Sequence, residues 1–195
     1  MVKHLYLVRH GQTQFNKLKI IQGSCDAKLT ELGLKQAKQA GIYLRQQGIK
    51  FDKIYCSRAL RARQTLETMI DQPYTYLTGL KEWDFGVFEG EGECLQDPKI
   101  FYRLPKDTYA LFGGESYAEF EKRVLTTIAE IAKTEAENIL IVAHGCVNLA
   151  FYQACQFKEG TNAEFLNCAI QVYRYENGNF IYERSIVPSR EVGDC

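Results

Sequence analysis

The chain of 195 residues lacks any hydrophobic run of the length that a membrane-spanning helix needs, about 20 residues. It also lacks an excess of charge, because 24 lysine and arginine residues balance 24 aspartate and glutamate residues. With a net charge of zero, neither nucleic acid nor an anionic membrane surface is expected as a partner. The apolar run near the N-terminus is too short for a signal peptide, so we expect a cytoplasmic protein.

Metal-binding patterns are missing as well. The seven cysteines show no CxxC spacing and no cluster with histidine, which argues against a structural zinc site. No group of carboxylates is spaced to hold magnesium, so we expect no metal and no other cofactor. In a reducing compartment the cysteines are expected to remain thiols, most of them behaving as small buried hydrophobic residues.

What the sequence does contain is an alternation of short apolar strands with amphipathic helices. Hydrophobic residues make up 46% of the chain and charged residues 25%, an ordinary balance for one domain spanning residues 1–195. The alternation predicts a three-layer α/β/α sandwich with a mostly parallel central sheet, and Asn177-Gly178 predicts a hairpin that forms an antiparallel edge. Strands are expected at about 3–8, 51–55, 74–77, 139–142, 170–175 and 180–184, helices after Thr30, Arg58, Ser116 and Gly145, and an irregular lid at about 84–115.

Two of the expected helices carry clear signals for their start and their buried face. Ser116 and Glu119 form a capping box, and Phe120, Val124, Ile128 and Ile131 then recur on one side. The other helix has Thr30 as its N-cap. Its expected buried face consists of Leu34, Ala37, Ala40 or Gly41, and Leu44.

The chain has three histidines, and two of them stand at the end of an apolar strand, directly before glycine. These are His10, in the run Leu5–Gly11, and His144, in the run Ile139–Gly145. Ligands of open α/β sheets bind at the carboxyl ends of the strands. If the two strands are parallel neighbours, both imidazoles face one pocket. The third, His4, lies at the other end of its strand and is expected to be structural.

Arginines accompany the two histidines. Arg9 precedes His10, and Arg58 and Arg61 stand at the start of a predicted helix, next to a strand end. The helix dipole disfavours cations there by roughly 0.3–1 kcal/mol, an objection that a bound anion would remove. Guanidinium groups bind phosphate oxygens in pairs, so this set predicts a phosphate site, to which Asn16 is a candidate addition.

Such a site can perform phosphoryl transfer. Neutral His10 is the candidate nucleophile, because neighbouring arginines disfavour its protonated form and lower its pKa. Glu82 is the candidate proton donor for the leaving alkoxide, since it follows a strand and begins a loop rich in glycine and aromatic residues. A bound phosphate dianion would raise the pKa of that carboxyl.

At these residues the sequence resembles the histidine phosphatase superfamily, which includes the cofactor-dependent phosphoglycerate mutases and their phosphatase relatives. The resemblance runs from Leu7 to about Val172 and is carried by Leu7–Thr13 with Asn16, Gln22-Gly23, Leu29–Gly33 with Gln36-Ala37, Ser57 with Arg61–Thr65, Glu82 with Phe85-Gly86 and Glu89-Gly90, Gly113–Ser116, and Val142–Gly145. It implies the same α/β sandwich.

The resemblance also implies roles for individual residues. His10 would be the phosphorylated nucleophile and Glu82 the proton donor. The phosphate pocket would be formed by Arg9, Arg61 and His144 with help from Asn16, and Gln22 and the main chain near Gly145 would contribute. Arg58 stands where many members have proline, so it remains a candidate substrate contact outside the core set.

Phosphatase and mutase share the first half-reaction, and the lid favours the phosphatase. The lid carries Lys99, Arg103 and Lys106 but no adjacent Arg-Arg pair such as the mutases have, and it is shorter than theirs. We therefore expect hydrolysis of small phosphate monoesters without a bisphosphate primer, by a monomer or a homodimer. A phosphoglycerate mutase, a catalytically silent binding protein and a binuclear metal hydrolase are the alternatives. The lid aromatics either line an apolar pocket or pack the lid: Phe85, Phe88, Phe101, Tyr102, Tyr109 and Phe112.

Overall fold

The computed structural model describes residues 2–96, 107–155 and 163–191. Its centre is a six-stranded sheet in the order β3-β2-β4-β1-β5-β6. Strands β1 to β4 pair in parallel, whereas β5 pairs antiparallel with both β1 and β6. The prediction of a mostly parallel sheet with an antiparallel edge is thus confirmed. The strands are β1 (Lys3–Arg9), β2 (Lys53–Cys56), β3 (Thr75–Tyr76), β4 (Asn138–Ala143), β5 (Ile170–Glu176) and β6 (Asn179–Ile186).

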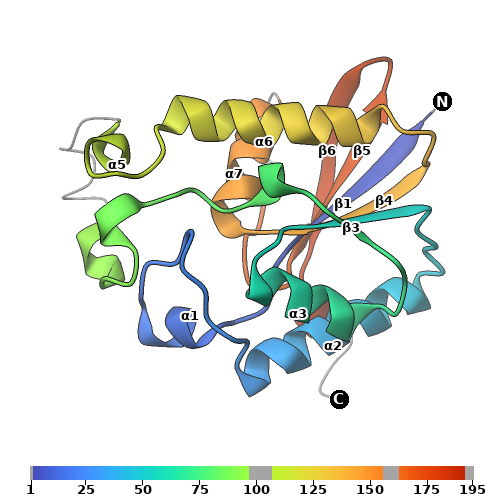
Figure 1. Cartoon of the computed structure of the whole chain (residues 1–195). Helices are drawn as coiled ribbons and strands as arrows, with labels where there is room; N and C mark the ends of the chain where they lie inside the picture. The colour runs from blue at the N-terminus through green and yellow to red at the C-terminus, as the bar shows by residue number, and fades with distance from the viewer. Residues whose placement is uncertain (1, 97–106, 156–162, 192–195) are drawn as a thin grey trace.

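Helices cover both faces of the sheet and make the predicted three layers (Figure 1). On one face, α2 (Glu31–Gln46) and α3 (Leu60–Met69) pack against alternate residues of the strands, and on the other face α6 (Tyr117–Ala132) and α7 (Gly145–Ala154) pack against the rest. The shorter elements are α1 (Gln14–Leu18), η1 (Thr78–Leu80), η2 (Gly86–Phe88), η3 (Glu93–Gln96), α5 (Thr108–Leu111) and α8 (Pro188–Glu191).

The two longest helices begin where their caps predict. Helix α6 starts with the Ser116–Glu119 capping box and buries all four apolar residues named for it. Helix α2 starts after Thr30, whose side chain accepts a hydrogen bond from the Gly33 amide. Leu34 is an exception to the predicted face, since it is 42% exposed. The close approach of Gly33 to the Gln12 backbone turns the helix so that Gly33, and not Leu34, faces inward.

The antiparallel edge is the predicted hairpin. Asn177 and Gly178 join β5 to β6 with φ angles of 52° and 82°. A two-residue turn with both φ angles positive is the kind that Asn-Gly favours between strands. No helix of the described residues is long and apolar enough to cross a membrane.

The prediction for the cysteines is half right. Of the six that the structure describes, Cys56, Cys155 and Cys168 are buried and Cys94 is exposed. The other two, Cys25 and Cys146, are half-buried. Within the predicted lid, the helices that the structure describes are η2, η3 and α5. The candidate lid cations Lys99, Arg103 and Lys106, and the aromatic residues Phe101 and Tyr102, lie outside the described residues.

Candidate active site

The two strand-ending histidines lie side by side. Strand β1 pairs in parallel with β4 so that Arg9 is opposite Ala143, which places His10 and His144 at matching positions one residue further on. Their ring centroids are 5.4 Å apart, with the rings inclined at 65°. Gly11 fits against α2 closely enough that a Cβ there would lie 2.6 Å from the Gly33 carbonyl oxygen, which holds the turn after His10 in place.

The protonation of His10 follows from its backbone contact. Its Nδ1 lies 2.8 Å from the Gly11 carbonyl oxygen. A carbonyl can only accept, so Nδ1 carries the hydrogen and Nε2 keeps its lone pair. Burial lowers the pKa of His10 well below its usual value, and the charges of Arg61 and Arg9 lower it further. His10 therefore presents a neutral imidazole with Nε2 available as a nucleophile.

The second histidine is engaged on both ring nitrogens. Nδ1 of His144 accepts a hydrogen bond from Arg61 Nε at 3.2 Å, so its hydrogen is on Nε2, which donates to Ser57 Oγ at 2.8 Å. Burial, followed by the Arg61 charge, lowers the pKa of His144 well below its usual value. His144 is a neutral ring that stands behind His10 and links it to Arg61.

Arg61 is completely buried, and the chain itself supplies its partners. Its guanidinium donates to the carbonyl oxygens of Gly23 and Cys25 and to the carboxylate of Asp26, 3.0 Å away. Asp26 also accepts from the amides of Leu60 and Arg61 at the start of α3. At this helix end, where a bound anion is expected from the sequence, the structure places the carboxylate of Asp26.

The loop that holds Arg61 is fixed by a second carboxylate. Glu89 accepts hydrogen bonds from the amides of Gly23, Ser24 and Cys25, and from that of Phe85. Only glycine fits at position 23, since a Cβ would lie 2.1 Å from the Trp83 carbonyl oxygen. The Arg61 carbonyl partners are thus positioned by contacts on the opposite side of the loop.

Glu82 faces the histidines from another segment. Its side chain is 6% exposed and accepts hydrogen bonds from the amides of Trp83 and Cys146, both at 3.0 Å. Burial raises the pKa of Glu82, although the two amides and the charges of Arg61 and Arg9 oppose the shift. Arg123 of α6 holds this segment by donating to the carbonyl oxygens of Gly79, Lys81 and Glu82, while its charge pairs with Glu115.

Three further polar residues, Arg9, Asn16 and Gln22, line the cavity together with His10 and Glu82. Arg9 donates from one terminal nitrogen to the Phe165 carbonyl oxygen at 2.7 Å, and its buried Nε has no hydrogen-bond partner among the described residues. The Gln22 amide oxygen accepts from Thr13 Oγ1, which leaves the buried Nε2 likewise without a partner in the described chain. Asn16 is also at the site, although its Oδ1 accepts from the Thr13 amide. Two unused buried donors beside a nucleophile suit the oxygens of an anion.

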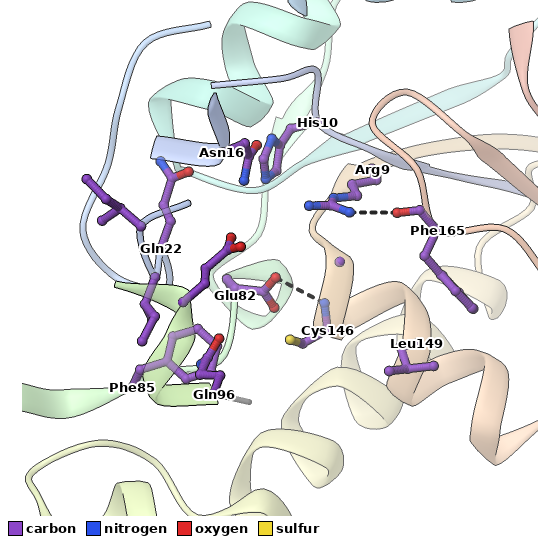
Figure 2. Close-up of a pocket in the computed structure, with 14 residues that line it drawn as sticks. Arg9, His10, Asn16, Gln22, Glu82, Phe85, Gln96, Cys146, Leu149 and Phe165 are labelled. Carbon is purple, nitrogen blue, oxygen red and sulfur yellow. Dashed lines mark hydrogen bonds between the residues drawn. The ribbon is translucent and has the colours of Figure 1, made fainter. Parts of the chain in front are cut away.

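These groups open onto a cavity of about 280 Å³ (Figure 2). The figure shows Arg9 and His10 at one end, Phe85 and Gln96 at the other, and Glu82 between them. Arg61 and His144 lie behind this surface and are not among the residues that line it. The described lining is Arg9, His10, Asn16, Ile20, Ile21, Gln22, Glu82, Phe85, Glu93, Gln96, Gly145, Cys146, Leu149 and Phe165.

A family model described as the histidine phosphatase superfamily, branch 1, matches residues 5–186. The chain belongs to the histidine phosphatase superfamily. The match covers every residue of the site described above, from both strand-ending histidines to Glu82. The family that the sequence resembles is thereby confirmed.

Relatives of this superfamily member include proteins named as phosphatases and proteins named as phosphoglycerate mutases. This chain is 33% identical over 150 residues to a broad-specificity phosphatase of Saccharomyces cerevisiae. The match covers 72% of this chain and 65% of that protein, which is just under two thirds of its length. It is 35% identical over 162 residues to a 2,3-bisphosphoglycerate-dependent phosphoglycerate mutase of Rhizobium etli, covering 72% and 74%. The crystal structure of phosphoglycerate mutase from Bacillus anthracis shares the fold, with a TM-score of 0.83, 24% identity and coverage of 94% and 92%.

Arg58, one of the predicted substrate contacts of this superfamily member, does not line the cavity. Arg58 is exposed, and its guanidinium lies 6.0 Å from the centre of the Tyr76 ring at the β3 edge. The structure therefore does not place Arg58 among the residues that line the cavity. Gly145, in contrast, lies at the cavity, where a Cβ would stand 3.4 Å from Arg9 Nε.

Several residues at the site have no signal in the sequence pattern. These residues reach the site from loops or from a helix turn, and the orientation of both depends on tertiary packing. Within the described chain, no group of three or more His, Cys, Asp or Glu side chains is arranged to hold a metal ion. The residues that sequence reasoning missed are Asp26, Glu93, Gln96, Arg123, Cys146, Leu149 and Phe165.

Proposed function

We propose that this protein is a phosphatase that hydrolyses small phosphate monoesters through a phosphohistidine on His10 Nε2. The observation that carries the proposal is the pairing of two buried groups in one cavity. His10 is held neutral, with its lone pair on Nε2, and Glu82 is a carboxyl whose pKa is raised. A nucleophile and a proton donor at opposite sides of a bound ester are the two groups that phosphoryl transfer to histidine requires.

The first half-reaction forms the phosphoenzyme. The His10 Nε2 lone pair attacks phosphorus, the bond from phosphorus to the ester oxygen breaks, and Glu82 gives its proton to that oxygen. The free alcohol leaves. Arg9 and Gln22, which line the cavity with His10, bind the phosphoryl oxygens through their side-chain nitrogens, and the buried charge of Arg61 stabilises the transition state through the His144 contact and its field.

The second half-reaction restores the enzyme. The Glu82 carboxylate accepts a proton from a water molecule as the water oxygen attacks phosphorus. The bond between phosphorus and Nε2 then breaks, which returns the electron pair to His10 and releases inorganic phosphate. The proposal includes no metal, no other cofactor and no bisphosphate primer, and it takes a small phosphorylated metabolite in the cytoplasm as the substrate.

Two other functions are carried as outcomes of the test. A mutase would pass the phosphoryl group to a second hydroxyl, and relatives with that name share the sequence. A silent binding protein would bind phosphate esters without turnover, although the arrangement of His10 and Glu82 favours chemistry. Phosphate binding by Arg9 and Gln22 is compatible with a phosphatase, a mutase and a silent binding protein. Measurement of turnover therefore distinguishes the three functions.

The test is release of inorganic phosphate from 4-nitrophenyl phosphate in excess EDTA, with the phosphoenzyme trapped by a quench in SDS at alkaline pH. We expect an acid-labile phosphohistidine that His10→Ala abolishes together with turnover. Efficient interconversion of 2- and 3-phosphoglycerate that requires a bisphosphate primer would show a mutase. Full activity of His10→Ala, or loss of activity in EDTA that added metal restores, would overturn the proposal.

A further inference from the structure

We infer that Asn167 is a positioning residue of this site: it holds the peptide group between His10 and Gly11, so that the nucleophile keeps its tautomer and its direction. Asn167 is not among the described residues that line the cavity, and it therefore acts through the backbone of His10. The inference rests on the proposed phosphatase activity and adds a residue to its machinery.

Asn167 reaches the nucleophile because the segment before β5 runs beside the end of β1. The two strands pair antiparallel. Two further backbone hydrogen bonds extend this pairing, since the Arg9 amide donates to the Ala169 carbonyl oxygen at 3.2 Å and the Cys168 amide donates to that of Arg9 at 3.0 Å. The next residue along the segment is Asn167, which therefore meets His10.

A tight turn just before β5 ends the backbone pairing at this point. The Ala169 amide donates to the Leu166 carbonyl oxygen at 3.0 Å, and Cys168 has a φ angle of 58°. A positive φ at the third residue is a property of type II turns. The turn leaves the side chain of Asn167, instead of a backbone group, to make the contact with His10.

The Asn167 side chain binds the His10 backbone directly. Its Nδ2 donates to the His10 carbonyl oxygen at 2.9 Å and to Asn16 Oδ1 at 3.4 Å. The amide nitrogen carries two hydrogens, so it can serve both oxygens at once. Asn16 Oδ1 also accepts from the Thr13 amide at 3.2 Å, which holds Asn16 independently of Asn167. We therefore expect the loss of Asn167 to affect His10 more than Asn16.

The peptide between His10 and Gly11 is held from two sides. Asn167 binds its carbonyl oxygen, and Thr65 Oγ1 of α3 accepts from its N–H, the Gly11 amide, at 2.9 Å. This peptide leads to the Gly11 carbonyl oxygen, which accepts the Nδ1 hydrogen of His10. Because a peptide group is planar and rotates as a unit, its rotation would move that acceptor away from the ring. Asn167 thus helps to keep the Nε2 lone pair free and directed at the substrate.

Nitrogen NMR of the imidazole rings tests this role without any need for turnover. The chain has three histidines, and the signals of His10 are those that His10→Gln removes. At pH 7 we expect the Nδ1–H tautomer for His10 in the unmodified protein, and a mixture with the Nε2–H tautomer in Asn167→Ala. The matched control is Asn179→Ala, which removes the same amide from an exposed position of the β5–β6 hairpin and should leave the tautomer unchanged.

Kinetics on two esters test whether the loss falls on the nucleophile. Asn167→Ala should lower kcat about tenfold or more, by the same factor for 4-nitrophenyl phosphate and for benzyl phosphate, because the proton donor Glu82 is unaffected. The inhibition constant of inorganic phosphate should stay within about threefold, since the groups that line the cavity remain. A general loss of structure would weaken phosphate binding together with kcat.

The outcomes separate this inference from the phosphatase proposal. If the unmodified protein does not hydrolyse 4-nitrophenyl phosphate, the phosphatase proposal fails, and the NMR comparison still decides whether Asn167 sets the His10 tautomer. An unchanged tautomer in Asn167→Ala, a kcat within twofold of the unmodified protein, or equal effects of Asn167→Ala and Asn179→Ala would overturn the inference while the phosphatase proposal stands. If Asn167→Ala does not fold, Asn167→Leu takes its place, because leucine keeps the side-chain volume without the donors.

Discussion

The Nδ1 hydrogen of His10 is donated to the Gly11 carbonyl oxygen across 2.8 Å, so a peptide group one residue away sets the tautomer of the nucleophile. Burial and two arginines lower the His10 pKa well below 6.5. We therefore expect kcat/KM for 4-nitrophenyl phosphate to persist as the pH falls through 6.5 and to decline only at a lower pH, where Nε2 becomes protonated. A pH profile from 4 to 8 measures this, and an acid limb centred at 6.5 or above would contradict it.

Glu82 should govern the alkaline side of the pH profile for benzyl phosphate, whose alkoxide leaving group needs a proton. Its pKa is raised from the usual 4.5, and as a proton donor it works only while protonated. Activity should fall as the pH rises through the Glu82 pKa. Glu82→Gln should slow hydrolysis of benzyl phosphate by about 10²–10⁴-fold and of 4-nitrophenyl phosphate much less, because nitrophenolate leaves without a proton. Equal losses on both esters would mean that Glu82 does not protonate the leaving group.

Arg123 is expected to act on the chemistry through Glu82, without touching the substrate. Its guanidinium holds three carbonyl oxygens of the segment that ends at Glu82. Arg123→Met should therefore lower kcat for benzyl phosphate on the order of 10²-fold through misplacement of the donor, with a smaller loss for 4-nitrophenyl phosphate. Lys122→Met, at the exposed neighbouring position, is the control. If both esters lose activity equally, the role of Arg123 is only structural.

Removal of the Asp26 charge should affect both stability and the phosphate site. Asp26→Asn leaves the buried Arg61 without its counter-ion and weakens the contacts at the start of α3. We expect the free energy of unfolding to fall by about 1–3 kcal/mol, and KM to rise as Arg61 shifts. Urea denaturation with steady-state kinetics measures both effects. Asp71→Asn, on an exposed loop, removes the same charge and should change neither.

Stability should also decline in mild acid because of the two buried imidazoles. His10 and His144 have folded-state pKa values well below the 6.5 expected in the unfolded chain. Their contribution is present above pH 6.5 and is lost as the pH falls below it, by up to about 1.4 kcal/mol per pH unit for each. Urea denaturation between pH 7 and 5 should show this slope, and His10→Gln should remove about half of it. A flat profile for the unmodified protein would exclude the buried neutral pair.

The sequence predicts the sheet and the histidine pair because both depend on local patterns. Short apolar runs alternate around β1 and β4, and each run leads straight into His-Gly, so only the parallel pairing of neighbours has to be assumed. The missed contacts depend on chain segments that are far apart in sequence. Asp26 meets Arg61 35 residues away, and Arg123 meets Glu82 41 residues away.

A 3.6- or 2-residue period in the sequence does not reveal such long-range contacts, and for the same reason it does not reveal that Arg58 lies away from the described cavity lining. Its position next to the strand end is correct, but the helix start turns its side chain outward over Tyr76 and turns that of Arg61 inward. Glu93 and Gln96 reach the cavity through a single short helix in an irregular stretch, where no periodic pattern exists to be detected.

The loop that holds Arg61 makes the site depend on contacts among three separate stretches of the chain. Arg61 is seated by the carbonyl oxygens of Gly23 and Cys25, and the amides of those two residues are in turn seated by Glu89. The Gly23–Cys25 loop, Arg61 and Glu89 must all be in contact for the guanidinium to be held in position. A fragment that contains only the β1–β4 pair therefore cannot form the phosphate pocket. A break in the chain between Gly23 and Asp26 would spare the sheet and its layers yet leave a folded molecule without a working anion receptor.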